Sequence, residues 1–327
     1  MMSKAQKVLV ARARHLCGSR RAWRDLSPIL VLVALLSTIG SLAPGFISLQ
    51  SLSILAHESS VILLLAVGQT AVVLMGGIDL SVGALASLTS VVIALLAPGE
   101  GALAVIAALF LASLIGLVQG LAHARGQLPS FVVTLAGLGL WSGIALTIAP
   151  ATVPISDGYG TIGWLEQDSF GVSNAFLFGL AVLCLIQVGL SRMPFGRYLY
   201  AIGMSERVAL MSGIRVWRVK TTAFVLSGTC SGLAGMVIAA RTSSGNPTIA
   251  DSLLLPSIAA VVVGGTAITG GYGGLGRTLV GVLMVAIMRV GLALTGLDPA
   301  YEPIVYGALV VFAAALTVNR DAGISVK

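Results

Sequence analysis

The chain has 327 residues, of which 57% are hydrophobic and only 9% are charged, and its mean hydropathy is +1.01. A soluble domain of this size would carry roughly 25% charged residues to keep its surface hydrated, so this composition excludes a water-soluble globular protein. The formal net charge of +7 does not indicate a nucleic-acid partner, because the basic residues collect between long uncharged runs, as they do in the loops of membrane proteins.

Long uncharged runs predict the helices that cross the membrane. A crossing needs about 20 largely apolar residues, because nothing in the bilayer core can satisfy a broken backbone hydrogen bond. We expect an all-α polytopic membrane protein, embedded in a lipid bilayer, with about ten crossings. They are predicted at 28–47, 55–74, 80–97, 102–122, 131–150, 174–191, 221–240, 255–271, 277–296 and 302–318.

Basic residues orient these crossings, because loops rich in Lys and Arg stay in the cytoplasm. In a ten-crossing arrangement with both termini inside, every Lys and Arg except Arg241 and Arg289 falls in a cytoplasmic segment. The run 29–43 ends in a small-x-small pattern typical of a cleaved signal peptide, but the long basic lead and the later crossings favour a retained first helix. The chain then divides into a basic cytoplasmic lead (1–27), a transmembrane domain (28–318) and a cytoplasmic tail (319–327).

The first glycine-rich stretch, residues 68–83, interrupts the second and third predicted crossings. It contains Asp79, and an acidic side chain near the bilayer centre costs roughly 2.5–3.5 kcal/mol on insertion scales. Gly76 and Gly77 let the helix break, and non-helical backbone at that depth survives only inside protein or beside a water-filled path. Two compatible hypotheses follow: the break lines a transport pathway, or Asp79 sits in a tight cytoplasmic turn and caps the next helix.

Two predicted loops are long enough to hold structure of their own. Residues 151–173 are acidic and are expected on the outer side, whereas residues 192–220 are basic and cytoplasmic. Between Gly196 and Gly213 the second loop predicts one short amphipathic helix. That helix either lies on anionic headgroups or docks a cytoplasmic partner, and the residues alone leave both interpretations open. Its apolar positions are Tyr198, Ala201, Ile202, Val208, Ala209 and Met211.

A second glycine-rich stretch covers residues 264–276 and is expected to break another helix beside the same pathway. Within it, residues 271–278 have the G-x-x-x-x-G-R-T spacing of a phosphate-binding loop. However, Arg277 stands where such a loop needs lysine, and no strand precedes it. We therefore expect that this chain does not hydrolyse ATP itself.

Polar residues elsewhere give little support to enzyme chemistry. The cysteines at 17, 184 and 230 are far apart in the sequence, so we expect no disulfide, no metal site and no cofactor. His57 and Glu58 begin the second crossing and are expected to be structural. Arg289, in the ninth crossing, needs an acid or helix-end carbonyls as a partner, because an unpaired charge there is costly.

Four ordered stretches resemble the ribose-type permease family of bacterial ABC importers. They are 76–83 (GGIDLSVG), 128–135, the segments 195–203 and 212–214, and 263–266 with the following Gly270 and Gly271. The likeness covers nearly the whole chain after residue 28. It implies a permease fold similar to that of type II importers, in a pair with a second copy or a sister permease. Two cytoplasmic ATPase subunits would power the pair, and a periplasmic binding protein would deliver the solute.

The resemblance also assigns sites. Residues 192–220 become the coupling loop that receives the ATPase stroke, although Met204 and Ser205 depart from the Gly-Gly-Asn-like step usual in the family. The residues expected to couple the ATPase are Gly196, Arg197, Gly203, Glu206, Ala209 and Gly213. Those expected along the pathway or at its helix breaks are Gly76, Gly77, Asp79, Ser81, Gly83, Phe131, Gly264, Gly265, Gly270 and Gly271.

The leading hypothesis is therefore a permease of the bacterial inner membrane that imports a small polar solute, a monosaccharide or polyol, with Asp79 holding local geometry. An ion-coupled secondary transporter would instead use Asp79 or Glu58 as a proton relay and would need no nucleotide. A non-transporting membrane scaffold is the third hypothesis, and it predicts that both glycine-rich stretches tolerate replacement.

Overall fold

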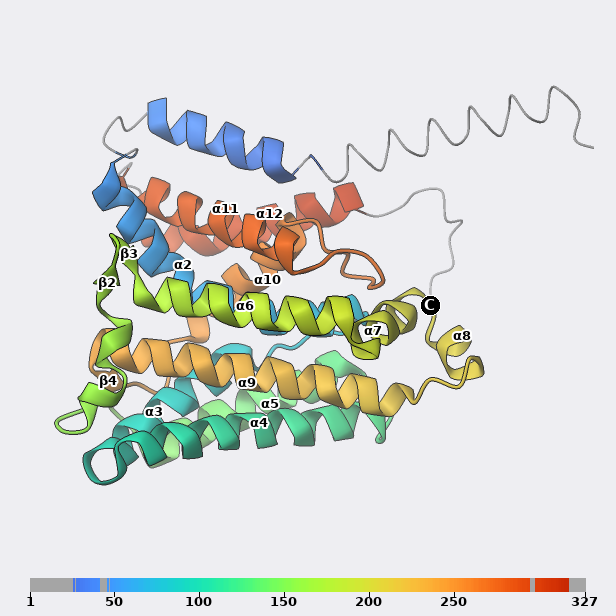
Figure 1. Cartoon of the computed structure of the whole chain (residues 1–327), viewed down its shortest axis with the longest axis horizontal. Coiled ribbons are helices and arrows are strands. Elements are labelled where there is room, and N and C mark those ends of the chain that lie inside the picture. Colours follow the sequence, from blue (N-terminus) through green and yellow to red (C-terminus); the bar gives the residue numbers. More distant parts are fainter. Residues whose placement is uncertain (1–25, 27, 42–45, 47, 295–297, 318–327) are drawn as a thin grey trace, which may run out of the picture.

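The computed structural model describes residues 26, 28–41, 46, 48–294 and 298–317. Its helices lie side by side along one common direction and form a bundle with loops at both ends (Figure 1). The predicted tail, 319–327, and the predicted lead, apart from Leu26, fall outside the described residues.

Within this part of the chain, seven helices are long and apolar enough to cross a membrane. They are α2 (Leu49–Leu74), α3 (Val82–Glu100), α4 (Ala102–Ala124), α5 (Ser130–Ile148), α6 (Asn174–Arg192), α9 (Val216–Thr242) and α11 (Leu275–Leu294). Three shorter apolar helices accompany them: Pro28–Ser41, α10 (Leu254–Val263) and α12 (Glu302–Thr317). Each predicted crossing overlaps one of these helices, and the predicted helical class is confirmed.

Three predicted boundaries are wrong. The second crossing was expected from residue 55, but α2 begins at Leu49. The eighth crossing was expected to reach residue 271, but α10 ends at Val263. Gly264 follows it, and Gly265 turns the chain with a φ of 92°, a conformation that favours glycine. The seventh crossing was expected from residue 221, but α9 begins at Val216, whose side chain is buried. Because basic residues lie near the start of α9, its first helical turn was assigned to the loop.

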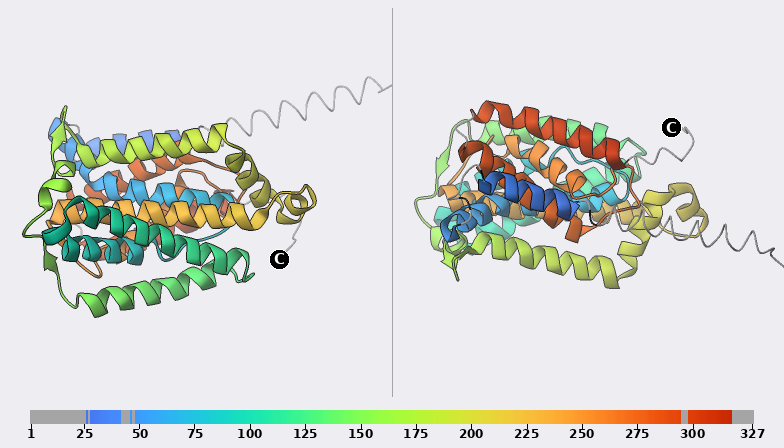
Figure 2. Two further views of the ribbon diagram at one scale, coloured as in Figure 1. Left: turned by 60° about the horizontal axis from the view of Figure 1, so that its bottom comes forward. Right: turned by 90° about the horizontal axis from the view of Figure 1, so that it is seen from above.

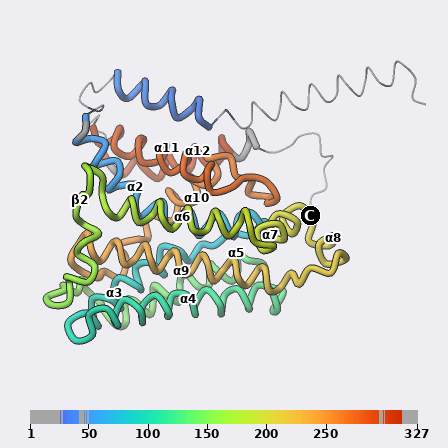
Figure 3. Tube along the Cα trace, in the orientation of Figure 1, coloured from blue at the N-terminus to red at the C-terminus, as the bar shows by residue number. Residues whose placement is uncertain are grey.

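The centre of the bundle is α2. All side chains from Ile62 to Val67 are inaccessible to solvent, because α2 packs against α3, α6, α9, α10 and α11. The longest described helix, α9, also runs through the core and extends along most of the length of the bundle (Figure 3). By contrast, α5 has only three buried residues, Thr134, Gly137 and Ala145, and its exposed apolar side chains are suited to lipid or to another chain.

Close contact between α4 and α9 depends on small residues, as is usual where helices pack in a membrane. A β-carbon at Gly228 of α9 would lie 2.5 Å from the carbonyl oxygen of Ala112, and one at Gly120 of α4 would lie 2.8 Å from the Cα of Thr221. The two backbones therefore approach too closely for any larger residue at these positions.

The two ends of the bundle differ. At one end lie two small antiparallel pairs: β1 (Val153–Pro154) with β4 (Ser244–Gly245), and β2 (Asp168–Ser169) with β3 (Val172–Ser173). Three short 3-10 helices, η2 (Tyr159–Thr161), η3 (Gly163–Leu165) and η4 (Asp251–Leu253), belong to the same loops, and η5 (Pro299–Tyr301) precedes α12. At the opposite end, α7 and α8 project beyond the bundle in all the views of Figures 1 and 2.

The single amphipathic helix expected between Gly196 and Gly213 is wrong. This segment forms two helices, α7 (Pro194–Met204) and α8 (Glu206–Met211). Ser205 separates them with an extended backbone, and its hydroxyl accepts a hydrogen bond from the backbone N–H of Val208 at the start of α8. An N-cap serine of this kind starts a new helix, so the apolar positions that looked like one stripe belong to two differently directed helices.

Candidate coupling and translocation site

The first glycine-rich stretch forms the turn between α2 and α3, as predicted. Gly76 has a φ of 82°, and its N–H donates to the carbonyl oxygen of Val73. The N–H of Gly77 reaches back to the carbonyl oxygen of Val72 over 3.0 Å. Glycine with positive φ is the usual way to end a helix, so the sequence stops α2 at this point.

Asp79 is buried in this turn, with 2% of its surface exposed. Its Oδ1 accepts hydrogen bonds from the backbone N–H of Ser81 at 3.0 Å and from the Ser81 hydroxyl at 2.7 Å. Its Oδ2 accepts one from the Ser227 hydroxyl of α9, also at 2.7 Å. Asp79 lies two residues before Ser81, the N-cap of α3, so it holds the turn that leads into α3 and ties that turn to α9.

The rest of the turn is held by polar side chains from other helices. The hydroxyl of Ser81 contacts the side-chain amide of Gln119 on α4 within 3.1 Å. On α5, the Ser130 hydroxyl accepts from the N–H of Ile78, and the Thr134 hydroxyl donates to the Ile78 carbonyl oxygen. Gln119, Ser130 and Thr134 were not among the predicted site residues. Ser130 and Thr134 lie in the stretch 128–135 that resembles the permease family, whereas for Gln119 the signal was a polar residue within an otherwise apolar run.

Gly83 and Phe131 have different surroundings. A β-carbon at Gly83 would lie 2.6 Å from the carbonyl oxygen of Ala250, so this glycine lets the first turn of α3 touch the segment before α10. Phe131 follows Ser130 at the start of α5, and 52% of its surface is exposed. It therefore lies beside the turn without entering its hydrogen-bond network.

The second glycine-rich stretch forms the loop between α10 and α11. Arg277 spans this loop: its Nη1 donates to the carbonyl oxygen of Gly265 at 3.2 Å, and its Nη2 to the hydroxyl of Tyr272 at 2.7 Å. The hydroxyl of Thr278 lies 2.7 Å from that of Thr70 on α2, in a buried position. The start of α11 is therefore fixed to α2, and Arg277 acts within the loop that we had compared with a phosphate-binding sequence.

The two glycine-rich stretches meet, and α7 joins them. The N–H of Gly271 donates to the carbonyl oxygen of Leu74 at 2.9 Å. A β-carbon at Gly270 would lie 2.6 Å from the backbone nitrogen of Gly76, and one at Gly203 would overlap both Leu74 O and Gly271 N. We call this contact of Gly76, Gly203, Gly270 and Gly271 the glycine junction. It joins the turn after α2, the loop after α10 and the last turn of α7.

Tyr200, one turn before Gly203, adds a second link between α7 and the loop. Its hydroxyl donates to the carbonyl oxygen of Gly273 at 2.9 Å. Burial raises the pKa of Tyr200 above its ordinary value, against a smaller opposing effect of Arg277. The phenol therefore keeps its proton and remains a donor at neutral pH.

The six predicted coupling residues fall into two groups. Gly196 and Ala209 are buried, and Gly203 belongs to the glycine junction. Arg197, Glu206 and Gly213 lie at the surface, where Glu206 holds the Nζ of Lys220 at 2.8 Å and thereby attaches α8 to α9. The largest exposed apolar side chains of this region, Met204 (78%), Val208 (61%) and Met211 (84%), were not predicted as coupling residues.

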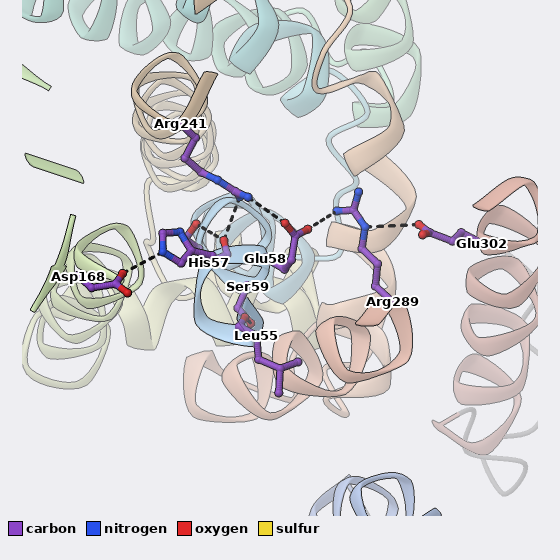
Figure 4. A network of polar contacts seen from close by, with 9 residues as sticks. Leu55, His57, Glu58, Ser59, Asp168, Arg241, Arg289 and Glu302 are labelled. Atoms are coloured by element: carbon purple, nitrogen blue, oxygen red, sulfur yellow. Dashed lines mark hydrogen bonds and ion pairs between the residues drawn. The ribbon is translucent and has the colours of Figure 1, made fainter. Parts of the chain in front are cut away.

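A cluster of ion pairs occupies the opposite end of the bundle (Figure 4). Glu58 of α2 lies between two arginines, 2.8 Å from Nη2 of Arg241 on α9 and 3.1 Å from Nη1 of Arg289 on α11. The Nε of Arg289 lies 3.6 Å from Glu302 of α12. We call these four residues the Glu58 cluster. The partner that Arg289 was expected to need is therefore a pair of carboxylates.

His57 makes a separate contact at this end of the bundle. Its Nε2 lies 2.9 Å from Oδ1 of Asp168 in the 151–173 loop, and its carbonyl oxygen accepts from Nη1 of Arg241. The structural roles expected for His57 and Glu58 agree with these contacts.

Comparison with known proteins identifies a family and several similar transport proteins. Residues 51–314 match the family model described as the permease component of branched-chain amino acid transport systems. The ribose import permease of Escherichia coli K12 is 35% identical over 316 residues, covering 92% of this chain and 95% of the relative. The fructose import permease of Rhizobium meliloti is 33% identical over 325 residues (95% and 89%). The D-allose transport system permease of E. coli K12 is 29% identical over 298 residues (90% and 91%).

No solved structure matches the chain. The family match and these near full-length relatives nevertheless agree with the four stretches identified in the sequence. The chain is thus a multi-pass protein of the bacterial inner membrane, and it belongs to the family of permease components of ABC importers.

Proposed function

We propose that this chain is the membrane-spanning subunit of an importer for a monosaccharide or a related polyol, powered by separate cytoplasmic ATPase subunits and supplied by a periplasmic binding protein. The glycine junction carries the proposal. It brings the predicted coupling loop, through Gly203, into direct contact with both helix breaks of the transmembrane bundle. A movement of α7 is therefore transmitted by direct backbone contacts to the turn that holds Asp79 and to the loop that leads into α11.

The arrangement in the membrane is part of the proposal: ten crossings, a type II importer fold, both termini in the cytoplasm, and pairing with a second copy or a sister permease. Two observations support this orientation. The basic segment 192–220, which contains α7 and α8, lies at one end, and basic residues favour the cytoplasm. Arg241 and Arg289, the two basic residues that this orientation places outside, are both paired with Glu58 at the other end.

The substrate class is supported by the relatives. The three reported above are named for ribose, fructose and D-allose, all of them neutral monosaccharides. Lipid would cover the apolar surface of α5 and α6, while the pathway would run beside the two glycine turns.

An ion-coupled mechanism finds less support. Both oxygens of Asp79 are occupied by hydroxyl and N–H donors, and both oxygens of Glu58 face guanidinium groups. These contacts give both carboxylates a structural role that requires no proton transfer.

The test is uptake by proteoliposomes that contain this permease together with its ATPase and are supplied with its binding protein. We expect uptake of a radiolabelled monosaccharide that requires internal ATP, stops when the ATPase lysine of the phosphate-binding loop is replaced, and survives a protonophore. Uptake that persists without nucleotide and collapses with the protonophore would contradict the proposal.

A further inference from the structure

A cavity of about 230 Å³ lies beside the Glu58 cluster, and neither the coupling loop nor the glycine junction reaches it. Three charged side chains line it, from Glu58, Arg241 and Arg289, together with the hydroxyl residues Thr242 and Ser252. Its remaining walls are the aliphatic side chains of Val61, Ile238, Ile249 and Leu253. We propose that this cavity binds one small, neutral, polyhydroxylated solute. The inference rests on the proposed function, because it locates a contact for the solute of that importer inside a single permease chain.

The volume of the cavity indicates the size of the ligand. A molecule in liquid water occupies about 30 Å³, so the cavity has room on the order of eight waters. A monosaccharide ring is a ligand of this scale.

The charge of the Glu58 cluster indicates a neutral ligand. The cavity wall carries two arginines and one glutamate, and Glu302, which pairs with Arg289 from outside the wall, supplies the second carboxylate. Three ion pairs link these four residues, so the formal charge of the cluster is zero. A pair of arginines without carboxylates would recruit an anion, and carboxylates alone would recruit a cation. The balanced cluster attracts neither, but it keeps donors and acceptors side by side, which is what vicinal hydroxyl groups need.

Hydrogen-bonding capacity remains on the cavity wall. Arg289 uses Nη1 and Nε for its two carboxylates, and Figure 4 shows its third nitrogen directed away from both of them. A guanidinium has five N–H donors in a fixed fork, so the ion pairs leave some of them for a ligand. Ser252 lies exposed at the rim and supplies a hydroxyl that can donate or accept.

The apolar side of the cavity completes the match. Sugars carry C–H groups on one side of the ring and hydroxyl groups at its edge, and binding sites combine apolar walls with a few placed polar groups. Ile249 and Leu253 supply such a wall. The charged groups are still between a quarter and a third exposed, at 26%, 27% and 34% for Glu58, Arg241 and Arg289. Water can therefore enter, and a solute can exchange.

The test uses the full-length permease alone, in lipid nanodiscs, without its ATPase or binding protein. Saturation-transfer NMR measures binding of D-ribose, D-fructose and D-allose, with D-gluconate as an anion of similar size. We expect saturable binding of at least one sugar and none of gluconate. Ser252→Phe, which fills the cavity without touching an ion pair, and Arg289→Gln should each weaken sugar binding at least tenfold.

Asp168→Asn is the matched control, because Asp168 forms an ion pair at the same end but does not line the cavity. We expect its sugar binding to stay within twofold of the parent protein. Arg289→Gln can also disturb the fold. If this variant elutes as an aggregate, the sugar binding of Ser252→Phe alone tests the inference.

Absence of saturable sugar binding, equal binding of gluconate, or sugar binding that Ser252→Phe leaves unchanged would overturn the inference. In each of these cases the complete transporter would still be expected to take up sugar with ATP, because the proposed function does not depend on this cavity. Uptake without nucleotide would overturn the proposed function instead, whatever the nanodisc experiment gives.

Discussion

Gly203 of α7 lies so close to the carbonyl oxygen of Leu74 that any side chain at position 203 would overlap it. Leu74 is the last residue of α2, and its carbonyl oxygen also accepts the hydrogen bond from Gly271. One backbone atom therefore connects α7, the first glycine turn and the second glycine loop. A change at Gly203 must move at least one of them.

Gly203→Ala is predicted to reduce ATP-driven uptake at least tenfold. Overpacking of a tight contact costs about 1–3 kcal/mol, and here the added methyl group meets backbone on two sides. Gly189→Ala, on α6, is the control, because a β-carbon there has nothing within 4 Å. Uptake and ATPase rates of the two variants are compared in the same proteoliposomes. Equal uptake by both variants would show that the glycine junction does not transmit movement.

Asp79→Asn is predicted to lower the thermal stability of the detergent-solubilised protein. The carboxylate accepts three hydrogen bonds from Ser81 and Ser227, and bonds to a charged acceptor contribute about 1.5–3 kcal/mol each. An amide can keep one oxygen as an acceptor, but its NH₂ group faces a donor.

A double-mutant cycle of Asp79→Asn with Ser227→Ala measures the coupling. We expect a non-additive effect of about 1 kcal/mol, since the two side chains are in direct contact. Strict additivity would mean that Ser227 does not hold the turn to α9.

The sequence predicted the positions of the helices because hydrophobic length is a strong signal in a membrane protein. It also placed the break after α2 correctly, since Gly76 and Gly77 interrupt an otherwise continuous run. It failed at α10, where the apolar residues Ala267 and Ile268 follow the glycines and extend the run past the true end of the helix. Composition cannot tell a helical apolar segment from an apolar loop that protein buries.

The site was less predictable than the fold. The two glycine-rich stretches and Gly203 were each identified, but nothing in the sequence indicated that they touch, because the contact joins segments that are far apart in the chain. The Glu58 cluster was unpredictable for the same reason, because its residues also come from distant segments of the chain. Arg289 was expected to need a partner, and only the packing of α2, α9, α11 and α12 at one end could identify Glu58 and Glu302 as that partner.

Glu58→Gln is predicted to destabilise the protein more than Asp168→Asn does. Loss of Glu58 removes the shared carboxylate of two neighbouring arginines. Arg241 is then left without a carboxylate and Arg289 keeps only Glu302 at 3.6 Å, and a partly buried charge that loses its partner is costly. Asp168 is more exposed, at 43%, and its partners are the imidazole of His57 and the hydroxyl of Ser53, so the contribution of its ion pair is expected to be below about 1 kcal/mol. Thermal unfolding at low and high salt measures both variants, and a smaller effect for Glu58→Gln would contradict the central position of this residue.

Met211→Cys is predicted to cross-link to a cysteine on the ATPase subunit in the assembled importer. Met211 ends α8 with 84% of its surface exposed, and a large exposed apolar side chain at the tip of a protruding helix is typical of an interface. The background is a permease in which Cys17, Cys184 and Cys230 have been replaced, because Cys184 is itself exposed.

Ala209→Cys is the matched control on the same helix, because Ala209 is only 2% exposed and points into the bundle. We expect a cross-linked band with a bifunctional maleimide for Met211→Cys and none for Ala209→Cys. ATP should change the yield for Met211→Cys if α8 moves with the ATPase. Cross-linking of both variants alike would mean that α8 unfolds in the complex, and cross-linking of neither would place the ATPase contact on another part of the 192–220 loop.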